Sequence, residues 1–176
     1  MRKVDLEWFN LGSVQNLYEY LKPDDYFRKL SSEELKTIGL YMFIDKADQA
    51  RYIGQAFNNK QYPLAHRVRW EIVKNGAGCA ESAFFQKCTK YAVDRFDFTL
   101  KVAHIKNPLQ DGSVVEEEDK ETMKFFINAV ERALIFKMAT LGQPLMNETG
   151  KTSYKLGPIE IANSKDHIPL PKSICL

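Results

Sequence analysis

Two short apolar runs separated by a polar link place the strongest constraint on the fold of this chain. Residues 39–45 and 50–54 are rich in aromatic and branched side chains, and the link 46–49 is polar. This pattern predicts a β-hairpin. Because the segments on either side have helical periodicity, the expected fold class is α/β (α+β).

Tyrosines occur at matching positions in the two strands of this hairpin. If Gly39 pairs with Gly54, then Tyr41 lies directly opposite Tyr52. Residues opposite each other in a hairpin project on the same side. The two phenols are therefore expected on one face of the sheet.

The remaining elements follow from capping signals and from the spacing of apolar residues. The first third of the chain is expected to be helical, with Ser13 capping a helix that ends before Pro23. Alternating apolar residues predict a strand over 95–105. The tail is predicted to be mostly loop, and Ile159 and Ile161 are the candidates for an edge strand. The other helices expected are 63–73, about 80–91 and about 120–141.

Length and composition indicate one domain. The chain has 176 residues, 44% of them hydrophobic, and no linker rich in Gly, Ser or Pro. We expect a helical N-terminal extension over 1–37, a central unit over 38–151, and a tail over 152–176 that packs on the same domain. No run of about 20 apolar residues could span a bilayer, and the first residues include acids where a signal peptide is apolar. The expected location is the cytoplasm.

The distribution of charge is more informative than the net charge of +2. Residues 60–106 contain nine basic and four acidic side chains. This excess fits a surface for a polyanion, and it also fits ordinary solvated helix faces. The three cysteines have neither the number nor the spacing of a disulfide framework or a zinc site.

Glu131 is an acid within an apolar part of the long helix. Every residue from 125 to 136 is apolar except Asn128, Glu131 and Arg132. A carboxylate in such a position needs a partner or a cation if it is buried. The alternative is an exposed pair with Arg132, and the residues alone favour neither interpretation.

Taken in order, these features resemble the GIY-YIG nuclease family. The resemblance covers roughly residues 38–151, and its value lies in the ordered set of motifs, since each tripeptide alone is a weak signal. The matching segments are Gly39-Leu-Tyr41, Tyr52-Ile-Gly54, His66-Arg67-Val68-Arg69, Glu131-Arg-Ala-Leu-Ile135 and Pro144-Leu-Met-Asn147.

The resemblance implies a fold and a chemistry. The implied fold is a small three-stranded antiparallel sheet flanked by helices, with 38–151 as the catalytic domain. The implied activity is hydrolysis of DNA phosphodiesters with one divalent metal ion, Mg²⁺, for which Mn²⁺ is expected to substitute. Such a site needs a base, a cation on the phosphate and a Lewis acid.

Five residues take catalytic roles from the resemblance. Tyr41 corresponds to the tyrosine that activates water, and Tyr52 supports it. Arg67 corresponds to the arginine that holds the scissile phosphate, Glu131 to the metal ligand, and Asn147 to the asparagine that helps shape the site.

Four further residues are expected to contact DNA, namely Arg69, Gln55, His66 and Lys151. Gln55 stands where many members of the family carry lysine. His66 adjoins Arg67 and is a candidate phosphate contact, while the simpler interpretation is a solvated helix histidine.

Few residues lie outside the motifs, which favours a stand-alone enzyme resembling the restriction endonucleases of this family. Its partner would be double-stranded DNA, and cutting of both strands would suit a homodimer. The alternatives are a nuclease for DNA repair or for branched junctions, and a DNA-binding or interaction module that keeps the fold without cutting.

Overall fold

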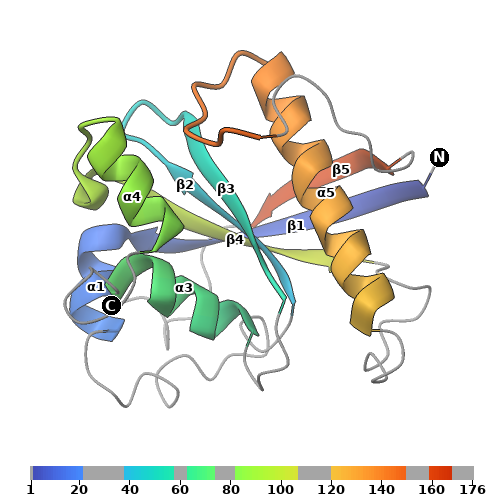
Figure 1. Cartoon of the computed structure of the whole chain (residues 1–176), viewed down its shortest axis with the longest axis horizontal. Coiled ribbons are helices and arrows are strands. Elements are labelled where there is room, and N and C mark those ends of the chain that lie inside the picture. Colours follow the sequence, from blue (N-terminus) through green and yellow to red (C-terminus); the bar gives the residue numbers. More distant parts are fainter. Residues whose placement is uncertain are drawn as a thin grey trace.

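The computed structural model describes residues 2–21, 38–57, 63–73, 82–106, 120–149 and 159–167. Figure 1 shows helices packed around a twisted sheet, so the mixed α/β class is confirmed. The elements, in chain order, are β1 (Arg2–Ser13), α1 (Val14–Leu21), β2 (Gly39–Ile44), β3 (Ala50–Ala56), α3 (Pro63–Val73), α4 (Ala83–Lys90), the 3₁₀ helix η2 (Arg95–Asp97), β4 (Thr99–Lys106), α5 (Lys120–Thr140) and β5 (Ile159–His167).

Within these residues the sheet has five strands in the order β3-β2-β4-β1-β5, so the expected number of three is wrong. The three expected strands are adjacent to one another in the order β3-β2-β4. Beyond them, β1 pairs antiparallel with β4 and parallel with β5. The two ends of the described chain thus belong to the same sheet as its centre.

The expectation of a wholly helical N-terminal extension is also wrong, because β1 occupies its first part. Val4, Leu6 and Trp8 are buried on one side of the strand, and the residues between them are more exposed. This period of two is characteristic of a strand. The helix expected after Ser13 is confirmed as α1, and the Ser13 hydroxyl accepts a hydrogen bond from the Asn16 amide at 3.2 Å.

In the tail, the edge strand through Ile159 and Ile161 is confirmed as β5. The Trp8 indole donates to the Ser164 hydroxyl at 3.0 Å, and Lys137 donates to the carbonyl of Ile161 at 2.9 Å. These contacts tie β5 to β1 and to α5. The rest of the predicted loop lies outside the described residues.

The hairpin of β2 and β3 has a different register from the predicted one. Tyr41 lies opposite Gly54, and Phe43 lies opposite Tyr52. Arg51 has no partner in β2 and forms a β-bulge. The bulge and a turn that is longer than predicted together shift the pairing of the two strands by two residues. A shift of two preserves the side on which a residue projects, so the two tyrosines share a face as predicted.

The predicted helices are confirmed with adjusted ends. Helix α3 has the predicted bounds, and Leu64, Val68 and Ile72, which lie four residues apart along it, are buried. Helix α4 starts later, after the capping residue Ser82, and the strand predicted from 95 begins at Thr99 because η2 precedes it. No helix in the described parts of the chain is long and apolar enough to cross a membrane.

Helices cover both faces of the sheet. One hydrophobic cluster joins α1, α3 and α4 to one face, and the second joins α5 to the other. Figure 1 shows β3 passing between α3 and α4 on one side and α5 on the other. Side chains from both faces can therefore meet at this edge strand.

Candidate active site

A cavity of about 220 Å³ lies where α3, α5 and the hairpin meet. Its wall includes five of the residues predicted to act in catalysis or DNA binding, namely Tyr41, Tyr52, Gln55, Arg67 and Glu131. They come from four elements that are separated in the sequence, β2, β3, α3 and α5. The fold thus brings most of the predicted site into one place.

Tyr41 reaches into this region because Gly54, its partner in β3, has no side chain. A Cβ atom at position 54 would overlap the ring and hydroxyl of Tyr41. The Tyr41 hydroxyl donates to Glu71 Oε1 at 2.8 Å and accepts from Arg67 Nε at 3.1 Å. Tyr41 is fully buried, and burial and the Glu71 carboxylate raise its pKa well above the usual value of 10. It is therefore a neutral phenol.

Arg67 is anchored by two contacts. In addition to its bond to Tyr41, Nη2 pairs with Glu71 Oε1 at 2.8 Å, one helical turn along α3. Burial opposes its charge, but Tyr41 and Glu71 more than compensate and raise its pKa above the usual value. These contacts occupy Nε and Nη2, whereas Nη1 has no partner among the residues that the structure describes. Because 37% of the side chain is exposed, a ligand can reach it.

Glu71 is the residue that sequence reasoning missed. It is completely buried, and it accepts from Tyr41, from Arg67 and, through Oε2, from the backbone amide of Phe84 at 2.9 Å. Its own carbonyl accepts from the Ser82 hydroxyl at 3.0 Å. Two features of the sequence could have indicated Glu71. It is an acid next to the apolar Ile72, and it follows Arg67 by one helical turn. Glu71 joins α3, α4 and β2 through one carboxylate.

Tyr52 lies beside Tyr41, with 6.4 Å between the ring centroids. Burial and then the charge of Glu71 raise the pKa of Tyr52, while Arg67 and a hydrogen bond with Tyr41 act in the opposite direction. Tyr52 keeps 8% exposure, whereas Tyr41 has none. Tyr52 is thus the more accessible of the two phenols.

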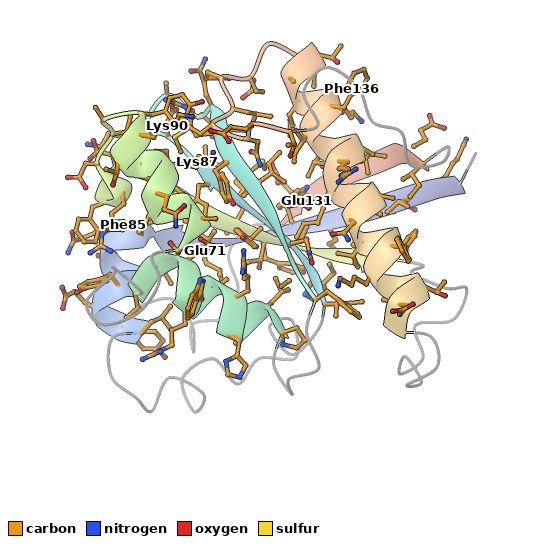
Figure 2. The ribbon with its side chains drawn as sticks, viewed as in Figure 1. Glu71, Phe85, Lys87, Lys90, Glu131 and Phe136 are labelled. Atoms are coloured by element: carbon orange, nitrogen blue, oxygen red, sulfur yellow. The ribbon has the colours of Figure 1, made fainter. Side chains whose placement is uncertain are left out.

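Glu131 enters the cavity from α5, and Figure 2 shows it across β3 from Glu71. Burial raises its pKa to about 7, against the opposing charges of Arg67 and Arg132. Within the described part of the chain it makes no hydrogen bond or ion pair. The alternative of an exposed pair with Arg132 is therefore not what the structure contains.

Gln55 lies in the cavity wall on β3. Its Nε2 donates to Asn128 Oδ1 at 3.2 Å, and this bond connects β3 to α5. Its Oε1 is buried and has no hydrogen-bond partner. Buried amide oxygens usually have one, so this atom is an exception.

Asn147 is near the site but does not line the cavity. Its side chain accepts from the backbone amide of Ile53 at 3.0 Å and donates to the Ile53 carbonyl at 2.8 Å. Ile53 lies between Tyr52 and Gly54, so Asn147 fixes the edge of β3 at the cavity. Asn147 therefore holds this part of β3 from outside the cavity, and its role in the site stays a prediction.

The other predicted DNA contacts are not brought to the cavity wall. Arg69 donates from Nε to the carbonyl of Leu21 at 3.3 Å, at the end of α1. His66 is on α3 beside Arg67 but is not part of the wall. Lys151 lies outside the described residues.

The described residues contain no group of three or more His, Cys, Asp or Glu side chains that could hold a metal ion. A cation in this cavity would have Glu131 as its one carboxylate among the described wall residues. Comparisons found no protein-family model, no curated protein and no solved structure that matches this chain. The geometry of the cavity is therefore the basis for a proposal about function.

Proposed function

We propose that this protein is a divalent-metal-dependent DNA endonuclease of the GIY-YIG type, with sequence-specific cutting of duplex DNA as in restriction enzymes. The observation that carries the proposal is the convergence of Tyr41, Tyr52, Arg67 and Glu131 in one cavity. A phosphodiester is anionic and its leaving alkoxide is poor, so hydrolysis needs a proton acceptor and positive charge. The cavity offers groups for each requirement.

Arg67 binds the scissile phosphate through Nη1 and the second N–H of Nη2. Its bonds to Tyr41 and Glu71 fix the plane of the guanidinium before the substrate arrives. A planar guanidinium can contact two phosphate oxygens at once through N–H groups fixed in one plane, a geometry that a lysine ammonium lacks. Glu71 and Tyr41 thus act as positioning residues for this contact.

The donor set of the cavity fits a magnesium or manganese ion. Glu131 is a carboxylate that lines the cavity and makes no hydrogen bond or ion pair with the residues that the structure describes. Mg²⁺ commonly binds through one or two carboxylates, keeps several waters and takes substrate phosphate oxygens as further ligands. When bound, such an ion stabilises negative charge on the leaving oxygen.

The attacking water transfers its proton through the tyrosines. Tyr41 is fully covered, so Tyr52 is the phenol that a water in the cavity contacts. As the water oxygen bonds to phosphorus and the phosphorus bond to the leaving oxygen breaks, the water proton passes to the Tyr52 oxygen, the Tyr52 proton to Tyr41, and the Tyr41 proton to Glu71, along the hydrogen bonds between these groups. A solvent water supplies the proton that the leaving oxygen takes up. The raised pKa values of both phenols make a free tyrosinate unfavourable, and a relay avoids one.

Cleavage of DNA by matched variants tests the function. Wild type, Glu131→Gln, Arg67→Ala and the control Glu121→Gln, an exposed glutamate on the same helix, are incubated with long duplex DNA in Mg²⁺ or EDTA. We expect discrete Mg²⁺-dependent products from wild type and Glu121→Gln, and none from the other two. No cutting of duplex, single-stranded or branched DNA by wild type would contradict the proposal, and binding without cutting would favour a DNA-binding module.

The role of Tyr52 is tested with Tyr52→Phe, using Tyr91→Phe at an exposed tyrosine as the control. Loss of a group that transfers a proton in the transition state typically costs about 10²–10⁴-fold in rate. We expect a loss of this size for Tyr52→Phe and none for the control. Wild-type rates in Tyr52→Phe would exclude the relay.

A further inference from the structure

Gln55 contains the one buried side-chain oxygen or nitrogen atom without a hydrogen-bond partner among the described residues. Its Nε2 is held by Asn128, so the amide has a fixed orientation and its Oε1 remains unpaired. An amide carbonyl removed from water and left unpaired is unfavourable. A ligand that offers positive charge or a donor to Oε1 would remove this cost.

The bond to Asn128 also places Gln55 close to Glu131. Asn128 and Glu131 are three residues apart on α5, and residues at this spacing lie on the same side of a helix. Both Gln55 and Glu131 contribute to the cavity wall. Two side chains with oxygen atoms that can bind a cation, one charged and one neutral, thus line the same cavity, and Gln55 is bonded to a residue about one helical turn from Glu131.

The charges around these oxygens favour a cation. Arg67 and Glu71 form an ion pair, so their charges largely offset each other. With both tyrosines neutral, the described wall residues and the Glu71 carboxylate behind them then carry a net charge of −1 when Glu131 is ionised. An entering phosphodiester adds a further negative charge, which a divalent cation between Glu131 and the phosphate would neutralise.

We propose that Gln55 Oε1 is a second protein ligand, with Glu131, of the divalent cation in this cavity. The proposal rests on the function proposed above and adds a residue to its metal site. Amide oxygens are suitable ligands for hard divalent cations, and two protein oxygens leave room for waters and for phosphate. The ligands come from β3 and α5, and the Gln55–Asn128 bond sets their separation.

Binding of Mn²⁺ to the DNA-free protein tests the proposal without relying on activity. The free ion is measured by electron paramagnetic resonance during titration of wild type, Gln55→Met, Gln55→Glu and Glu131→Gln. Gln86→Met and Gln86→Glu, at an exposed glutamine of α4, are matched controls. Circular dichroism and thermal unfolding establish that each variant is folded.

We expect Gln55→Met to weaken Mn²⁺ binding about tenfold, since one ligand is lost. Gln55→Glu should tighten it about tenfold or more, because a second carboxylate replaces a neutral oxygen. The controls should match wild type. If Gln55→Met does not fold, the tightening in Gln55→Glu still decides the question.

Wild-type Mn²⁺ affinity in folded Gln55→Met, or no tightening in Gln55→Glu, would overturn the proposal. If Glu131→Gln abolishes Mn²⁺ binding at the same time, the proposed function stands and only the role of Gln55 fails. If Glu131→Gln also binds like wild type, the cavity is not the metal site and both proposals fail. Wild-type metal affinity with weakened duplex binding in Gln55→Met would mean that Gln55 contacts DNA instead.

Discussion

The two glutamates on either side of β3 differ in how their charge is satisfied. Glu71, on α3, is completely buried and accepts from a phenol, a guanidinium and a backbone amide. Glu131, on α5, is partly buried and has no hydrogen bond or ion pair within the described residues. Figure 2 shows the two side chains on different helices, one on each side of the edge strand.

The comparison separates a structural carboxylate from one that is available to a ligand. A buried charge is tolerated when several donors surround it, and then it joins the elements that supply them. A carboxylate whose charge is disfavoured by burial, and which has no hydrogen bond or ion pair among the described residues, gains most from a bound cation. The site thus combines a rigid anchor on one helix with a binding group on another.

Replacement of each glutamate should lower stability by very different amounts. Glu71→Ala leaves Arg67, the Tyr41 hydroxyl and the Phe84 amide without their acceptor. Because Glu71 is buried but the Arg67 side chain is partly exposed, the loss of unfolding free energy should reach at most the roughly 3–5 kcal/mol of a fully buried ion pair, measured by urea denaturation. Glu131→Ala, the matched variant, should cost under about 1 kcal/mol at pH 7. Equal losses would contradict the distinction.

The stability of the metal-free protein should depend on pH through Glu131. Its pKa is about 7 in the folded protein and ordinarily 4.5, so the folded state holds the proton more tightly. Its contribution to stability is therefore fully present below pH 4.5 and is lost as pH rises through 7. This shift corresponds to at most about 3 kcal/mol.

Urea denaturation in EDTA from pH 4.5 to 8 measures this dependence. Because Glu131→Gln cannot ionise, it should match wild type near pH 4.5 and exceed its stability at pH 8. Parallel curves for the two proteins would show that burial does not disfavour the charge of Glu131.

The contacts that hold Glu71 in place should depend on the first residues of α4. Ser82 caps this helix through the Phe85 amide at 3.1 Å and also donates to the Glu71 carbonyl. Loss of a capping serine costs about 1 kcal/mol. We expect Ser82→Ala to lower the unfolding free energy by about this amount and leave the pKa of Glu131 unchanged. A changed titration of Glu131 would mean that the two sides of the site are coupled.

The smallest effect is expected at Arg132, which is exposed next to Glu131. Its charge lowers the pKa of Glu131, so Arg132→Gln should raise that pKa by a few tenths of a unit. Carboxyl-carbon NMR titration at low ionic strength measures the change. A fall in the pKa would contradict the direction of this charge effect.

Local patterns in the sequence predicted the elements around the site. The apolar spacing of α3 and the aromatic runs of the hairpin were sufficient for their positions. The strand β1 was missed because Val4, Leu6 and Trp8 alternate with charged residues in a segment interpreted as a helical extension. The hairpin register depends on a bulge at Arg51, which the sequence does not mark.

The sequence predicted only those residues of the candidate site that belong to one of the ordered motifs. Tyr41, Tyr52, Arg67 and Glu131 were each identified from such a motif, and all lie in the cavity wall. Glu71 was missed because its position depends on α4 packing beside α3 and on Tyr41 crossing Gly54. These contacts involve residues that are distant in the sequence, and local periodicity carries no information about them.

The most direct test of the distinction between the two glutamates follows their carboxyl carbons by NMR as Mn²⁺ is added. Assignments come from Glu71→Gln and Glu131→Gln. We predict that Glu131 titrates near pH 7 when no metal is present. We also predict that substoichiometric Mn²⁺ broadens the carboxyl signal of Glu131 strongly and the carboxyl signal of Glu71 less. Titration of Glu131 at an ordinary pKa, or broadening of neither signal, would contradict the account.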